Sequence, residues 1–254
     1  MYKTYLGQTG AQIHVRSCGS GDTPLLCLPP APHTGLFFET VMRALAYPVQ
    51  AIDYPGYGGS DPLGEAASLT NSLAAYAQHL TDTLTEPRYH LFGFHTGNLV
   101  AAEMALLAPD RIDQIIMVDI PFFTPDVQKT YAAKLPKDSL PVPVEAGFSK
   151  AVTGRHGSIS EARAFALWVE SLRSGERSTE AFRGAFAYDC AGQFSKLDRP
   201  VHVIATQSGL LDPTRKAAEC LPQAHLSERL DMQAPVMEAN TQELADAIRE
   251  ILAT

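Results

Sequence analysis

The stretch Leu91-Phe92-Gly93-Phe94-His95-Thr96-Gly97-Asn98-Leu99 decides the fold, because it joins an apolar run to a helical pattern with no loop between them. Residues 89–94 are predicted to form a buried strand and residues 97–107 a helix. Glycines two positions before and two after His95 relieve the clashes between strand and helix in so tight a turn. We therefore expect His95, at the tip, to be strained and to project above the end of the strand.

Strand-like and helix-like segments alternate on both sides of this turn. The predicted strands are residues 3–6, 11–16, 24–28, 49–52, 112–118, 200–205 and 225–230, and the further helices are residues 37–45, 72–84, 213–220 and 241–252. Such alternation with short joins is typical of an α/β fold, a mostly parallel central sheet with helices on both faces. Residues 122–197 break the alternation and are predicted to be a helical cap insertion. The core is then formed by residues 1–121 and 198–254.

Composition and charge exclude several classes of protein. The chain has 254 residues, of which 45% are hydrophobic and 19% charged, as is usual for a globular domain. A formal net charge of -8 lacks the basic footprint of a nucleic-acid binder. No apolar run is long enough to span a membrane, and the first residues lack the apolar core of a signal peptide. The four cysteines lie far apart, which favours reduced thiols in a cytoplasmic protein.

A second motif, Asp53-Tyr54-Pro55-Gly56-Tyr57-Gly58-Gly59-Ser60, follows the predicted strand at residues 49–52. Together with the turn at His95 and the insertion after residue 121, it resembles the α/β-hydrolase fold family over essentially the whole chain. The elbow resembles that of a subgroup with His-Thr-Gly and a degenerate catalytic triad. The resemblance implies a Ser, Cys or Asp nucleophile at the elbow tip, followed later in the chain by an acid and a histidine.

The residues at those positions depart from the family pattern. His95 stands at the tip. Gly209 falls nearest the usual acid position, and Asp212 lies three residues later. Gln233 or Ala234 stands where the family has its histidine. The sequence therefore predicts His95 and Asp212 as catalytic candidates.

Three further predictions concern the surroundings of His95. Asp119, which follows the strand at residues 112–118, is an alternative acid, since some family members place theirs at this strand end. Pro29-Pro30 replaces the family's His-Gly, and proline has no N–H, so Ala31 and Thr96 are the candidate oxyanion donors. The remaining predicted binding residues, which shape the walls or approach the substrate, are His33, Phe94 and Gln233. No metal site is expected.

Two functions from different classes follow from these residues. The first is a cofactor-independent enzyme acting on a small organic molecule, by ester-type hydrolysis or by a lyase-type proton transfer, with His95 as nucleophile or as general base. The second is a non-catalytic member of the fold that binds a small apolar ligand or a protein partner. The simultaneous loss of the serine, the later histidine and the acid at its usual place motivates the second hypothesis.

Overall fold

The computed structural model describes the chain except for residues 8–9, 65–71, 136–148 and 150–158. Its centre is an eight-stranded sheet in the order β1-β2-β4-β3-β5-β6-β7-β8. The strands are β1 (Tyr2–Leu6), β2 (Ile13–Cys18), β3 (Leu25–Leu28), β4 (Val49–Ile52), β5 (Tyr89–Phe94), β6 (Ile112–Val118), β7 (Val201–Gln207) and β8 (Ala224–Gln233). β2 pairs antiparallel with β1 and β4, and the pairs from β4 to β8 are parallel. The predicted α/β fold class is confirmed.

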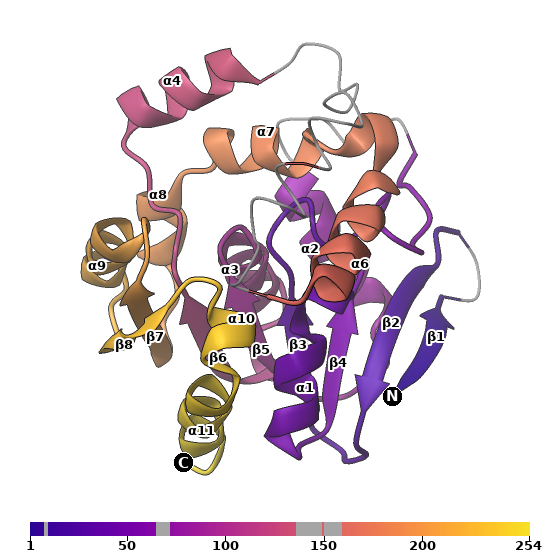
Figure 1. Ribbon diagram of the computed structural model, residues 1–254. Helices are drawn as coiled ribbons and strands as arrows, with labels where there is room; N and C mark the ends of the chain where they lie inside the picture. The colour runs from indigo at the N-terminus through magenta and orange to yellow at the C-terminus, as the bar shows by residue number, and fades with distance from the viewer. Residues whose placement is uncertain (8–9, 65–71, 136–148, 150–158) are drawn as a thin grey trace.

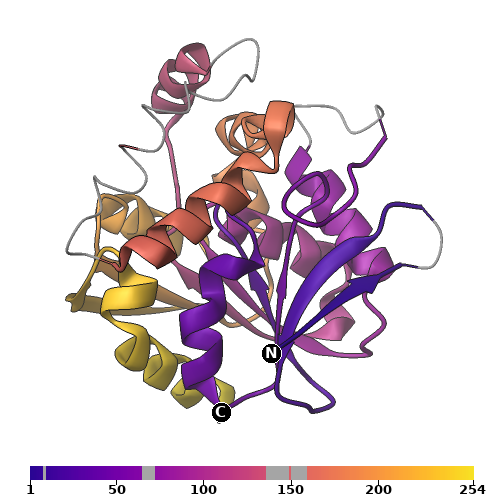
Figure 2. The same ribbon diagram turned by 45° about the vertical axis from the view of Figure 1, so that its right-hand side comes forward.

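Helices cover both faces of the sheet (Figure 1 and Figure 2). The helices of the core are η1 (Gly35–Phe38), α1 (Glu39–Leu45), α2 (Ser72–Thr83), α3 (Gly97–Leu107), η2 (Pro109–Arg111), α8 (Cys190–Phe194), α9 (Leu211–Cys220), α10 (Val236–Ala239) and α11 (Thr241–Leu252). Alternate residues of β3 enter different clusters, Leu26 and Leu28 with α2 and α3, Leu25 and Cys27 with α1 and α11. This period of two is why the strand reads as a continuous apolar run.

The segment predicted as an insertion contributes α4 (Pro125–Lys134), α6 (Glu161–Leu172), η4 (Gly175–Arg177) and α7 (Glu180–Ala187). These helices lie beyond the carboxyl ends of the parallel strands (Figure 1). Residues 136–148 and 150–158 of the predicted insertion lie outside the described residues. α8, at the end of this segment, packs against α3 and α9, and its Phe194 is fully buried in the core cluster.

None of the helices described here is both long and apolar enough to cross a membrane.

Candidate active site

The turn between β5 and α3 brings His95 to the carboxyl edge of the sheet. His95 has a φ of 50°, in the left-handed region that residues with a side chain rarely adopt. Its carbonyl accepts a hydrogen bond from the N–H of Asn98 at 3.0 Å, which closes the turn. A Cβ at Gly93 would lie 2.7 Å from the Asn98 backbone, and one at Gly97 would run into the carbonyl of Leu28. Both flanking glycines are thus required by backbone contacts, as the elbow motif predicts.

The imidazole of His95 is largely buried against an aromatic wall. It stacks on the ring of Phe94 with centroids 4.5 Å apart and 16° between the planes. Burial lowers the pKa of His95 below the ordinary 6.5, and the negative charge of Asp119 opposes this only in part. No hydrogen bond joins a ring nitrogen of His95 to another residue within the described part of the chain. At neutral pH the ring is therefore uncharged and carries a free lone pair.

Asp119 occupies the corresponding position on the adjacent strand. It follows β6 directly, has a φ of 51° and is fully buried. Its two carboxylate oxygens accept hydrogen bonds from Thr206, at 2.9 Å from the backbone N–H and 2.7 Å from the hydroxyl. The N–H of His95 donates to the carbonyl of Val118, the residue before Asp119, at 3.2 Å. The structure therefore brings His95 and Asp119 to neighbouring strand ends, each on a strained backbone.

Both side chains line one cavity of about 610 Å³. Its volume is in the range of small-molecule sites. Most of its wall is apolar, and the lining residues are Pro30, Ala31, His33, Phe37, Phe94, His95, Asp119, Leu167, Ser208, Gly209, Leu210, Ala234, Pro235, Val236, Met237 and Glu238. Of the predicted binding residues, Ala31, His33 and Phe94 are in this set. Phe37 joins two of them, with its ring 5.2 Å from His33 and 5.3 Å from Phe94 between centroids.

The predicted oxyanion donors are arranged differently from the expectation. The N–H of Ala31 donates to the hydroxyl oxygen of Thr96 at 2.7 Å, so it is already engaged. The N–H of Thr96 has no acceptor among the described residues, which leaves it as the one candidate donor of the pair. A preformed two-donor oxyanion hole is therefore not assembled from Ala31 and Thr96.

Two predicted residues lie away from the cavity. Asp212 is the second residue of α9, its side chain is 79% exposed, and its carboxylate pairs with Arg215 at 2.9 Å. Gln233, at the end of β8, is exposed, and its backbone N–H donates to the side-chain oxygen of Asn240 at 2.8 Å. Neither is in the lining of the cavity, whereas Ala234 is. The structure thus does not bring Asp212 or Gln233 to His95, because the chain turns outward at both points.

Sequence reasoning missed Glu238, Leu167 and Ser208 as parts of the cavity wall. Glu238 lies in α10, 143 positions after His95. A separation of this length in the sequence does not indicate whether two residues are close in space. Leu167 comes from α6 and is buried with 3% of its surface exposed. The apolar periodicity of a helix does not identify the partner that its buried face contacts.

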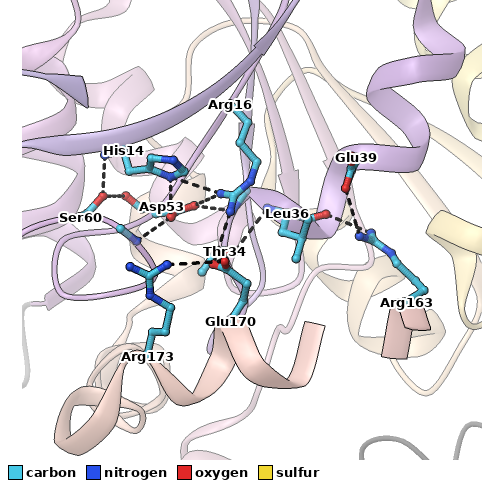
Figure 3. A network of polar contacts seen from close by, with 12 residues as sticks. His14, Arg16, Thr34, Leu36, Glu39, Asp53, Ser60, Arg163, Glu170 and Arg173 are labelled. Carbon is cyan, nitrogen blue, oxygen red and sulfur yellow. Dashed lines mark hydrogen bonds and ion pairs between the residues drawn. The ribbon is translucent and has the colours of Figure 1, made fainter. Parts of the chain in front are cut away.

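Asp53, the first residue of the glycine-rich motif, is the centre of a buried polar network (Figure 3). It accepts from Arg16 at 2.7 Å and from the backbone N–H of Gly59 at 2.9 Å, and it is 2.8 Å from Nδ1 of His14. Burial alone would raise the pKa of Asp53, but the His14 hydrogen bond, the Arg16 charge and the Gly59 N–H outweigh it and lower the pKa below 3.8. The carboxylate therefore braces the loop that carries it.

Within the described residues, no group of three or more His, Cys, Asp or Glu side chains is arranged to hold a metal ion.

The curated proteins that the chain resembles in sequence include hydrolases and esterases. The chain is 29% identical to a 2-hydroxy-6-oxononadienedioate/2-hydroxy-6-oxononatrienedioate hydrolase of Cupriavidus pinatubonensis over 118 residues, 44% of this chain and 41% of that protein. It is 36% identical to a pimeloyl-[acyl-carrier protein] methyl ester esterase of Aeromonas hydrophila over 86 residues, 33% and 32% of the two chains. These matches thus span less than half the length of either relative.

A solved structure described as a bromoperoxidase from Bacillus anthracis superposes with a TM-score of 0.80 at 18% identity, covering 100% of both chains. At that identity the likeness concerns the fold. A family model described as alpha/beta hydrolase fold matches residues 23–151, which is half of the chain and includes both the elbow and the Asp53 motif. The chain belongs to the α/β-hydrolase fold family.

Proposed function

We propose that the chain is a cofactor-independent enzyme of the hydrolase type in which His95 is the general base. The observation that carries the proposal is an imidazole at the elbow tip that lines an apolar cavity, with the buried carboxylate of Asp119 in the same lining. Burial lowers the pKa of this imidazole and so favours its neutral form. A strained backbone at a non-glycine residue costs of order 1–3 kcal/mol, which favours a functional reason for keeping a side chain there. We place the chain in a subgroup with a His-Thr-Gly elbow and α4, α6 and α7 as its cap.

The chemistry is a proton transfer. A ring nitrogen of His95 takes a proton from water, the water oxygen bonds to a carbonyl carbon of the substrate, and the proton passes to the leaving oxygen as its bond to that carbon breaks. The Thr96 N–H is the donor toward the charge that develops on the carbonyl oxygen. The charge of Asp119 stabilises the imidazolium that forms. With a substrate that carries its own acidic proton, the same base performs a lyase-type step.

A general base is favoured over a nucleophile by the Ala31 hydrogen bond. Attack by His95 itself would form two tetrahedral intermediates in succession, and each needs donors for its oxyanion. The Ala31 N–H cannot serve as such a donor because it donates to the hydroxyl oxygen of Thr96. The curated relatives are named as a hydrolase and as a methyl ester esterase, and we extend to this chain only the shared reaction type, hydrolysis.

The second candidate function, a non-catalytic binding protein, is favoured by the same Ala31–Thr96 hydrogen bond together with the outward positions of Asp212 and Gln233. A fold that keeps its cavity while losing the donors and the later acid suits a ligand that is held and not converted. The test of the first candidate therefore includes a readout of binding.

The test is turnover of short-chain aryl esters by the wild type, His95→Ala and Asp119→Asn. We expect His95→Ala to lose about a hundredfold or more of kcat/KM, because a positioned base contributes roughly 10²–10⁴. The rate of the wild type should fall as the pH drops through the His95 pKa, below 6.5, since only the neutral ring accepts a proton. Asp119→Asn removes the charge that raises this pKa, so the fall should move to lower pH.

The matched control is Asp110→Asn, a carboxylate lost at an exposed position of η2. It should leave both the rate and the pH profile unchanged. Turnover in His95→Ala equal to that of the wild type overturns the role of His95. The second candidate is supported instead if esters and compounds with an acidic proton bind to the wild type but are all recovered unaltered after incubation with it.

A further inference from the structure

The ring of Phe94 lies directly against the group proposed as the base. Its plane is 16° from that of the His95 imidazole, and the two ring centroids are 4.5 Å apart. The two rings are therefore stacked, since rings in an edge-to-face contact stand close to perpendicular. Stacking takes up a face of the imidazole and leaves the two nitrogens on the ring edge for the cavity that both residues line.

Phe94 is held in this position by its own packing. It is the last residue of β5, pairs with Val118 of β6 and is only 7% exposed. The ring of Phe37 packs on it with centroids 5.3 Å apart, and Phe37 in turn lies edge-on to Phe38 at 5.4 Å. The aromatic ring is therefore in place beside the imidazole before any proton is transferred, and it does not have to move when the imidazole becomes charged.

The charged groups around His95 do little to stabilise its protonated form. Asp119, which follows β6, raises the pKa of His95, but burial lowers it by more. The other titratable groups that line the cavity are His33, after β3, and Glu238 of α10, whose Oε1 accepts from Arg163 at 3.1 Å. The lining residues that the structure describes include no lysine or arginine. Protonation of His95 therefore depends on what else stabilises the cation.

We propose that Phe94 is a positioning residue that stabilises the protonated form of His95 through the face of its ring. The face of a benzene ring carries the negative part of its quadrupole and attracts a cation within about 6 Å of its centroid, more strongly in a desolvated site than in water. Phe94 thus makes His95 a stronger base without occupying either ring nitrogen. The inference rests on the proposed function in taking protonated His95 as a state that the reaction passes through.

The test is the titration of His95 in the wild type and in Phe94→Leu, without any ligand. It is followed by NMR from the Cε1 proton of the imidazole, whose signal is assigned by its loss in His95→Ala. Leucine keeps the position apolar but has no ring face, so we expect the acid dissociation constant of the His95 imidazolium to rise about threefold or more. A mere loss of packing would act in the opposite direction, because water that enters relieves the burial that lowers the pKa of His95.

Phe37→Leu is the matched control, since it removes another aromatic ring from the same cavity wall. The ring contacts of Phe37 within the described part of the chain do not include His95, so the dissociation constant should stay at the wild-type value. Phe94→Tyr keeps the ring and should also keep that value. In an Asp119→Asn background, Phe94→Leu should cause the same fold-change as in the wild type, because the ring and the carboxylate act on the cation independently.

An unchanged or smaller dissociation constant in Phe94→Leu overturns the inference, and so does an equal rise in Phe37→Leu. If Phe94→Leu does not fold, Phe94→Met carries the same test with the same outcomes. Because the titration is read without substrate, the two proposals fail separately. A rise in the constant with no turnover of any substrate contradicts the enzyme and not the role of Phe94. Turnover that depends on His95, with a constant that Phe94→Leu leaves unchanged, contradicts the role of Phe94 alone.

Discussion

His95 and Asp119 share an unusual backbone conformation. Both have positive φ, 50° and 51°, and neither is glycine. Each residue stands directly after a parallel strand, where the next residue must turn sharply and where Gly would be free of strain. That two adjacent strand ends both keep a reactive side chain at this cost argues that the two side chains are used together.

The cavity also indicates how a serine hydrolase could be restored at this site. In His95→Ser, the serine hydroxyl would lack a base to accept its proton, so we expect esterase activity near background. Adding Ala234→His places an imidazole at a position that lines the cavity, and activity should rise well above the single variant. Adding Gln233→His instead places it on an exposed residue outside the cavity and should give no gain.

Initial rates with an aryl ester distinguish these variants. The Gln233→His combination is the matched control, since it adds the same side chain one position earlier. Strong activity in His95→Ser alone would show that another base is in reach, and His33, which also lines the cavity, would then be the first residue to replace.

Among the elements, those predicted most accurately are those whose contacts are local. The β5–α3 turn follows from Gly93 and Gly97 within nine residues of sequence, and β6 and α3 follow from their apolar periodicity. The Asp53 motif is likewise recognised from a short stretch of sequence, whereas its buried partner Arg16 is seen only in the structure. Local backbone requirements leave a readable trace in the sequence.

The site is predicted less well, because its decisive contacts join distant elements. Thr206 binds Asp119 across 87 positions and Thr96 binds Ala31 across 65. Asp212 was predicted from its distance along the chain after β7, but α9 begins at Leu211 and directs it outward to Arg215. A single polar residue in a loop is not part of a repeating apolar pattern. Its sequence position therefore does not show which strand end its side chain will lie against.

The close packing of α3 against β3 gives a stability prediction for the elbow. Gly97→Ala places a methyl group against the carbonyl of Leu28, so it should lower the free energy of unfolding by about 3 kcal/mol. Helix propensity acts in the opposite direction, because alanine is favoured over glycine by up to about 1 kcal/mol. Urea denaturation of Gly97→Ala measures the net effect.

Gly209→Ala is the control for this substitution, since a Cβ there meets no atom within 4 Å. It should leave the urea midpoint close to that of the wild type. Equal midpoints for the two variants would mean that the strand and helix backbones can separate at the elbow without cost, which would contradict the close approach at Gly97.

Across the whole molecule, α6 is held to the core at both of its ends. Near its first turn Arg163 binds Glu238 and the carbonyls of Leu36 and Phe37, and near its last turn Glu170 lies 3.4 Å from Arg16 (Figure 3). Leu167, between them, lines the cavity. Breaking a buried ion pair leaves an uncompensated charge, which is unfavourable. The contacts at both ends therefore hold α6 in place as part of the wall of the cavity that His95 also lines.

The buried titratable groups predict a loss of stability in acid that proceeds in two stages. Burial is the main cause that lowers the pKa of His90, His95 and His202 below 6.5. The unfolded chain therefore binds protons near pH 6.5 that the folded chain does not, and the free energy of unfolding should decrease as the pH falls below that value. Asp53, with its pKa lowered below 3.8, contributes stability that is present above 3.8 and lost as the pH falls further through its folded value.

Urea midpoints at pH 7.5, 5.5 and 4.5 test the first stage, and we expect them to decrease in that order. Replacing His90 and His202 together by glutamine removes two of the three groups and should flatten the decrease, whatever the change at pH 7.5. His95 is kept in that variant, so the slope that remains between pH 7.5 and 5.5 includes the contribution of the group at the elbow. A midpoint that stays constant between pH 7.5 and 5.5 would mean that these imidazoles take up protons in the folded state, and the neutral ring required of the base at His95 would then be in question as well.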